Sequence, residues 1–235
     1  MHMSRSDSLL SQPLTVAQHT PNQAAMEHKN IFIIGAQCTG KTTIVNALKD
    51  HYTRNADKDV PEPTIITEVA RTVLKDLEID RHDIANSPEK SLQLQSAILK
   101  AQYQVETKAK ESGSWYVSDR SGIDPIVYAR LFVGEVAAQT LLKSPDWIAL
   151  EQNLKSGHVF LCEAGCTWLI DDGTRLMPKD AEQWEQFDQA FRKLLAELEV
   201  DYSVIPRDVK PIDERVAIVT KEHEASVTFA LRESV

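Results

Sequence analysis

Residues 35–42 read Gly-Ala-Gln-Cys-Thr-Gly-Lys-Thr, and this stretch decides the fold. It follows the short apolar run Ile31–Ile34, which is typical of a strand buried on both faces of a parallel sheet. It precedes residues 42–51, whose apolar side chains recur at helical spacing. Two glycines allow the backbone to approach an anion closely, and a helix N-terminus directs N–H groups at it. The stretch is therefore expected to bind phosphate.

The spacing of the two glycines, the lysine and the threonine matches the P-loop motif of nucleotide-binding proteins. Lys41 is expected to reach the β- and γ-phosphates, and the hydroxyl of Thr42 suits Mg²⁺. ATP and Mg²⁺ are therefore the expected cofactors. The side chains of Gln37 and Cys38 occupy variable positions and receive no individual role. The residues expected to surround the nucleotide are Gly35, Ala36, Gln37, Cys38, Thr39, Gly40, Lys41, Thr42 and Thr43.

Strand and helix patterns alternate along the rest of the chain. The expected strands are residues 31–34, 64–67, 115–118, 158–162 and 202–205. The expected helices are residues 42–51, 69–77, 91–110, 126–132, 136–142, 181–198 and 213–223. This alternation implies parallel strands joined by right-handed crossovers. We expect a doubly wound α/β fold with a five-stranded parallel sheet between two helical layers.

Most of the 235 residues are expected to form one domain. Residues 1–29 are rich in Ser, Gln, Thr, His and Pro and show no periodicity, which favours a flexible tail. Residues 30–235 then form the nucleotide-binding domain. A polar segment around residues 165–182 has the composition of a mobile lid.

The composition narrows the possible partners and the location. Hydrophobic residues make up 42% of the chain, which is ordinary for a protein with a buried core. The formal net charge of −9 argues against a nucleic-acid partner. The three cysteines, Cys38, Cys162 and Cys166, suit reduced thiols in a cytoplasmic protein better than a disulfide framework. No apolar run reaches the length of a membrane span. The sequence does not indicate the oligomeric state.

Acidic residues follow several of the expected strands. Glu68, Asp119 and Glu163 all lie just after strand patterns, and ligands of doubly wound folds bind at that edge of the sheet. A carboxylate at position 119 is placed to hold Mg²⁺, as the Walker B acid of P-loop proteins does. The alternative is that Asp119 caps the N-terminus of the next helix, and the two roles are compatible.

The chain lacks the signatures of several large P-loop classes. Residues 119–122, Asp-Arg-Ser-Gly, fit a GTPase pattern, but no Asn-Lys-x-Asp motif for guanine follows. An AAA+ motor needs a longer chain with a helical lid domain, and the signature of ABC proteins is absent. Kinases of small metabolites fit better, because they need arginines that neutralise the moving phosphoryl group. Arg120 and Arg175, the latter within the lid-like residues 171–175, are the candidates.

The acceptor side has three candidate residues. Glu68 is placed to accept a proton from an attacking hydroxyl, or it is simply a surface carboxylate at a helix start. Asp124 either orients the acceptor or caps the helix that begins near Pro125. Arg71, three residues after Glu68, is the third candidate.

Residues 35–43, 67–71, 118–129 and 171–175 together resemble the P-loop AAA-type ATPase/kinase family. That family includes the nicotinamide riboside kinase domain of bifunctional NAD-salvage proteins, and the resemblance covers roughly residues 29–224. It implies an ATP-dependent kinase fold related to nucleoside and nucleotide kinases. By position, it implies ATP·Mg contacts for Lys41 and Thr42, a metal-side acid or catalytic base at Asp119, phosphate clamps at Arg120 and Arg175, and an acceptor pocket at Glu68, Arg71 and Asp124.

Three functions remain open at this point. The first is a small-molecule kinase that phosphorylates a hydroxyl of a nucleoside-like acceptor. The second is a nucleotide-monophosphate kinase, in which Arg71 and Arg130 would hold the acceptor's phosphate. The third is a non-catalytic regulator that binds a nucleotide or a phosphoinositide.

Overall fold

The structure is a computed structural model, and it describes residues 28–56, 61–166, 178 and 180–233. Its centre is a five-stranded sheet in the order β2-β3-β1-β4-β5, with every neighbouring pair parallel. The strands are β1 (Ile31–Ile34), β2 (Thr64–Ile66), β3 (Tyr116–Asp119), β4 (His158–Cys162) and β5 (Ser203–Ile205). The expected doubly wound parallel sheet is confirmed.

The central strand β1 is buried on both faces, because its side chains alternate between two hydrophobic clusters. Phe32 and Ile34 pack into the cluster under the helices that follow β3 and β4, and Ile31 and Ile33 pack against α1 and α9. All four are fully buried. This two-sided burial explains why the strand reads as an uninterrupted apolar run.

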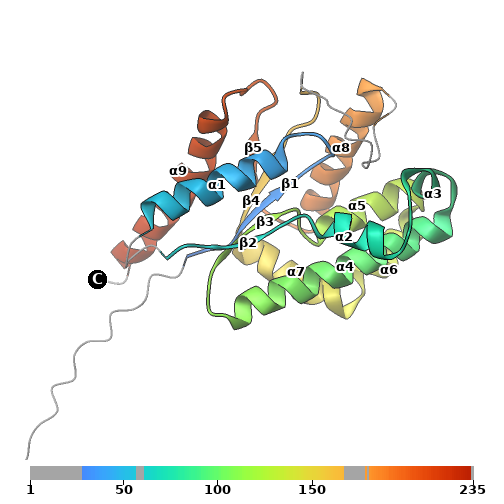
Figure 1. Cartoon of the computed structure of the whole chain (residues 1–235), viewed down its shortest axis with the longest axis horizontal. Helices are drawn as coiled ribbons and strands as arrows, with labels where there is room; N and C mark the ends of the chain where they lie inside the picture. Colours follow the sequence, from blue (N-terminus) through green and yellow to red (C-terminus); the bar gives the residue numbers. More distant parts are fainter. Residues whose placement is uncertain (1–27, 57–60, 167–177, 179, 234–235) are drawn as a thin grey trace, which may run out of the picture.

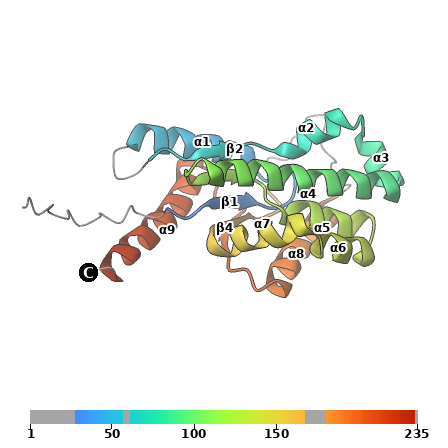
Figure 2. The ribbon, with the colours of Figure 1, turned by 90° about the horizontal axis from the view of Figure 1, so that it is seen from below.

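Helices cover both faces of the sheet (Figure 1). One layer consists of α1 (Lys41–Asn55) and α9 (Ile212–Glu233). On the other face, α4 runs alongside α5 and α7 (Figure 2). That layer is formed by α4 (Pro88–Glu111), α5 (Ile123–Phe132), α6 (Glu135–Leu142), α7 (Pro145–Ser156) and α8 (Ala181–Glu197). The short helices α2 (Val69–Asp76) and α3 (Arg81–Asn86) pack on α4 beyond the end of β2.

The structure corrects the expected helix pattern at several points. Two helices, α3 and α7, were not expected. The first is started by a capping box between Asp80 and Asp83, and the second by Ser144 followed by a proline. Helix α5 begins at Ile123 instead of residue 126, and α9 continues to Glu233 instead of residue 223.

Two expected features lie outside the described residues. Residues 1–27, which make up most of the expected tail, are not described, and neither are residues 167–177 of the expected lid. Arg175 is therefore not placed by the structure. In the part of the chain that is described, no helix combines the length and the apolar character needed to cross a bilayer.

Candidate nucleotide and acceptor site

The loop between β1 and α1 has the backbone conformation that its glycines predict. Gly35 has a φ of 128°, and a Cβ atom there would lie 2.7 Å from the carbonyl oxygen of Cys162 on β4. Gly40 has a φ of 86° and is the N-cap residue of α1. The first position therefore requires glycine and the second favours it, and together they turn the start of α1 toward the space above the sheet.

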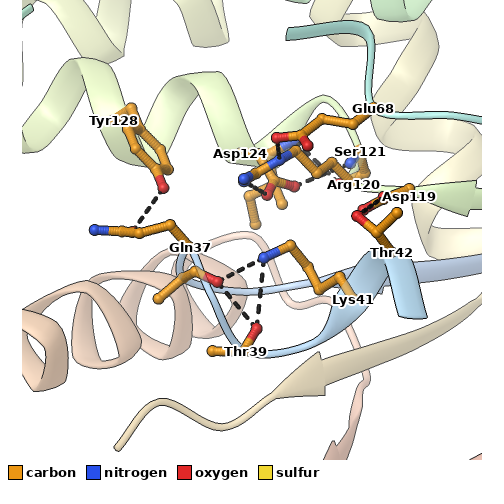
Figure 3. A network of polar contacts seen from close by, with 12 residues as sticks. Gln37, Thr39, Lys41, Thr42, Glu68, Asp119, Arg120, Ser121, Asp124 and Tyr128 are labelled. Atoms are coloured by element: carbon orange, nitrogen blue, oxygen red, sulfur yellow. Dashed lines mark hydrogen bonds and ion pairs between the residues drawn. The ribbon is translucent and has the colours of Figure 1, made fainter. Parts of the chain in front are cut away.

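Lys41 lies buried within the loop. Its Nζ donates to the carbonyl oxygen of Ala36 at 2.5 Å and lies 3.5 Å from Oγ1 of Thr39 (Figure 3). Burial, aided by the charge of Arg120, lowers the pKa of Lys41 to about 8. A phosphate group would reverse this effect, because an adjacent anion favours the charged form of the amine. The lysine is thus positioned for an anion.

Thr42 and Asp119 meet at the carboxyl end of the sheet. The threonine hydroxyl donates to Oδ2 of Asp119 at 2.5 Å. The other oxygen of this carboxylate, Oδ1, is buried and has no hydrogen-bond partner among the described residues. Mg²⁺ prefers oxygen ligands, so this unpartnered carboxylate oxygen and the neighbouring threonine hydroxyl suit a Mg²⁺ site. The N-cap role considered for Asp119 is not observed, because Gly122 is the N-cap residue of α5.

Arg120 joins two carboxylates at the end of β3. Its Nε lies 2.8 Å from Oε1 of Glu68, and its Nη1 lies 3.0 Å from Oδ1 of Asp124 (Figure 3). Burial alone would lower the pKa of this guanidinium, but Glu68, Asp124 and other neighbours raise it well above its ordinary value. The arginine adopts a φ of 80°, which is uncommon for a residue with a side chain. Its backbone N–H donates to the carbonyl oxygen of Ile33 at 2.9 Å, so β1 holds it in place.

Asp124 is the more deeply buried of the two carboxylates that pair with Arg120. It is 2% exposed, and burial raises its pKa even though Arg120 opposes the shift. Its Oδ2 accepts from the backbone N–H of Ser121 at 2.9 Å. Asp124 lies in the first turn of α5, where a carboxylate is favourable. The capping role considered for Asp124 is not observed, because Gly122 is the N-cap residue of α5 and no side chain caps it, whereas Asp124 does line a pocket.

Two adjoining pockets meet at Glu68 and Arg120. The first, which we call the phosphate pocket, has about 330 Å³ of empty space and is lined by Glu68, Arg120 and the loop residues Cys38, Gly40, Lys41, Thr42 and Thr43. The second, which we call the acceptor pocket, has about 550 Å³ of empty space, including space that is open to solvent. It is lined by Glu68, Arg120, Asp124, Gln37, Gln95 and Tyr128 together with Ala70, Leu74, Ile84, Leu94, Ile98 and Pro125.

Two arginines and one acid considered from the sequence are not among the described residues that line these pockets. Arg71 has a side chain that is 44% exposed and pairs with Glu68 at 2.9 Å. Arg130 pairs with Glu135 and Glu197, both at 2.8 Å. Glu163 accepts from the backbone N–H of Arg207 at 3.1 Å. None of the three lines either pocket among the residues that the structure describes.

Sequence reasoning missed several residues of the site. Arg215 on α9 is buried and donates from Nη1 to the carbonyl oxygen of Thr39 at 3.0 Å, directly supporting the phosphate loop. Gln95 and Tyr128 line the acceptor pocket from α4 and α5. The ring of Tyr128 also contacts the guanidinium group of Arg120, whose Cζ lies 5.9 Å from the ring centre. The signal available in the sequence for such residues was a polar side chain on an otherwise apolar face of an expected helix.

A family model described as an AAA domain matches residues 30–215, so the chain belongs to this family. A comparison of the sequence with curated proteins found no match.

Among solved structures, the chain is similar to the NadR protein in complex with NR, with 20% identity and a TM-score of 0.58. The match covers 81% of this chain and 51% of that one, so this chain spans about half the length of NadR. It is also similar to deoxyadenosine kinase from M. mycoides with bound dATP, with 14% identity, a TM-score of 0.53, and coverage of 83% and 98%. These likenesses show a shared P-loop kinase-like fold.

Proposed function

We propose that the protein is an ATP-dependent kinase that transfers the γ-phosphoryl group to a hydroxyl of a nucleoside-like acceptor. The observation that carries the proposal is that Glu68 and Arg120 line both the phosphate pocket and the acceptor pocket. A phosphoryl group moving between the two pockets would pass this pair. The solved structures that share this fold include NadR in complex with NR and a deoxyadenosine kinase, which is consistent with the proposal.

The residues of the two pockets suit distinct parts of such a transfer. Lys41 would bind the phosphates of ATP, and Thr42 and Asp119 would hold Mg²⁺, which neutralises phosphate charge when bound. Glu68 would accept the proton of the attacking hydroxyl. Arg120 holds the Glu68 carboxylate in place at 2.8 Å and would turn toward the phosphoryl group as charge develops on it.

The charge of the acceptor pocket favours a hydroxyl over a phosphate as the acceptor. The carboxylates of Glu68 and Asp124 already neutralise Arg120, at 2.8 and 3.0 Å. A phosphorylated acceptor needs additional cations. Arg71 and Arg130 do not line the pocket among the described residues.

The test is phosphoryl transfer to a panel of nucleosides that includes deoxyadenosine and nicotinamide riboside, followed by ATP consumption and by the mass of the product. We expect one or more nucleosides to gain a phosphate. Glu68→Gln should lower kcat by about 10²–10⁴-fold, the typical contribution of a general base, with the affinity for an ATP analogue retained. Glu111→Gln, at an exposed position on α4, is the matched control. Binding of ATP without transfer to any member of the panel would refute the proposal.

A further inference from the structure

Gln37 is a buried glutamine of the phosphate loop with one end of its amide group unused. The residue is 2% exposed. Its Oε1 accepts from the hydroxyl of Tyr128 at 2.8 Å, and its backbone oxygen accepts from Nε1 of Trp184 at 3.0 Å. Its Nε2 is buried and has no hydrogen-bond partner among the described residues. Buried polar groups in native proteins nearly always have partners, so this N–H₂ group calls for one that the described residues do not supply.

Adjacent residues of the loop face different pockets. Gln37 lines the acceptor pocket and not the phosphate pocket. Cys38, the next residue, lines the phosphate pocket and not the acceptor pocket. Figure 3 shows the Gln37 side chain extended away from Lys41 toward Tyr128. The missing partner of Gln37 is therefore to be sought on the acceptor side.

The hydrogen bond from Tyr128 determines which chemistry the amide offers. Burial raises the pKa of Tyr128 to about 12, so the hydroxyl keeps its proton at neutral pH. That single proton is donated to Oε1 of Gln37, and the free end of the amide is then the N–H₂ donor. A ligand atom that meets Gln37 must therefore be a hydrogen-bond acceptor.

The walls of the acceptor pocket define the rest of the ligand. Leu74 on α2 and Leu94 and Ile98 on α4 contribute apolar surface, while the polar groups Glu68, Arg120 and Asp124 are paired among themselves. A molecule that fills this space must present apolar faces to the helices and a hydrogen-bond acceptor on one edge. Heterocyclic bases have this combination.

We propose that Gln37 determines acceptor specificity by donating a hydrogen bond from Nε2 to a carbonyl oxygen or ring nitrogen of a heterocyclic base. This inference rests on the proposed function for the identity of the pocket. It assigns a residue of the phosphate loop to the acceptor, whereas its neighbours in the loop serve the nucleotide.

The test compares Gln37→Leu with Gln104→Leu, a matched change at an exposed position on α4. Calorimetry would measure the affinity for a panel of natural nucleosides, for adenosine analogues in which carbon replaces N3 or N7, and for a non-hydrolysable ATP analogue. We expect Gln37→Leu to weaken binding of the preferred nucleoside about tenfold or more, as loss of one buried hydrogen bond does, with the ATP analogue unaffected. In Gln37→Leu, the difference in affinity between nucleosides that carry the recognised base atom and nucleosides that lack it should disappear. Gln104→Leu should change none of these affinities.

Tyr128→Phe is the second variant, because it removes the hydroxyl that orients the amide and leaves the ring in place. It should weaken the same nucleoside in the same direction, and it keeps the test decisive if Gln37→Leu does not fold. Unchanged nucleoside affinity in the variants would overturn the inference. An equal loss for the nucleoside and the ATP analogue would also overturn it, since it would assign Gln37 a purely structural role in the loop. So would a wild-type protein that binds no nucleoside.

The proposed function fails separately, because it predicts turnover. If nucleosides bind through Gln37 but no phosphate is transferred, the proposed function is refuted and the assignment of Gln37 stands.

Discussion

Replacement of Arg120 by methionine removes the positive charge that lies between two buried carboxylates. The side chains of Arg120, Glu68 and Asp124 are 10%, 8% and 3% exposed. Methionine is apolar and of similar length, so the change leaves little empty space and chiefly removes the ion pairs. Removing one partner of a buried ion pair costs about 3–5 kcal/mol, because the remaining charge stays buried without compensation. We expect a loss of unfolding free energy in that range.

The chain offers a matched control for this experiment. Arg71 contacts the same Glu68 carboxylate at 2.9 Å, but its side chain is 44% exposed. Exposed ion pairs contribute about 0–1 kcal/mol, since water and salt screen them. Arg71→Met should therefore cost several-fold less unfolding free energy than Arg120→Met, although each substitution removes an arginine that contacts Glu68.

Urea unfolding followed by circular dichroism measures both free energies. Adding Asp124→Asn to Arg120→Met should recover part of the loss, because it removes the buried charge of Asp124 that Arg120 no longer pairs with. The reasoning is refuted if Arg120→Met costs less than 1 kcal/mol, or if the two single substitutions cost the same. In either case, burial would not govern the strength of these pairs.

Two further predictions concern the loop and the opposite edge of the sheet. Gly35→Ala should abolish binding of an ATP analogue and lower the melting temperature, because a Cβ atom there would lie 2.7 Å from a backbone oxygen of β4; normal nucleotide binding would contradict the loop geometry. Burial lowers the pKa of His223 to about 3 and also lowers that of His158, so the folded state favours the neutral rings. Stability from these groups is present above the unfolded pKa of about 6.5 and is lost as the pH falls below it, by about 1 kcal/mol for His223 alone between pH 7 and 5.5. Urea unfolding at a series of pH values checks this, and a flat profile over that interval would disprove it. The neighbouring groups that contribute are His28, Lys29 and Glu222.

Residues that directly follow strands could be predicted from the sequence. Strands β1 and β4 have the bounds that their apolar runs predict, and Asp119 ends β3 as expected. The carboxyl ends of parallel strands meet at one edge, so Glu68 and Asp119 had to lie near the phosphate loop. The order of strands and helices along the chain is therefore enough to predict that these two residues lie near the loop.

Residues that reach the site from helices could not be predicted in the same way. Which face of α4 or α5 meets the pocket depends on how α2 to α5 pack together, and short sequence patterns do not specify this. Gln95 and Tyr128 were missed for that reason, and Arg215 was missed because the packing of α9 against the phosphate loop is likewise not specified by such patterns. Helix α7 was overlooked although its buried residues Trp147, Leu150 and Leu154 have helical spacing.

The common position of Glu68 and Arg120 in both pockets has a thermodynamic consequence for the two ligands. A nucleotide that draws Arg120 toward its phosphates would loosen the hold on Glu68 and Asp124, and so change the affinity for the acceptor. Reciprocity then requires the acceptor to change the affinity for the nucleotide by the same factor. The order in which the ligands bind, and the strength with which the products inhibit, would both depend on these two side chains.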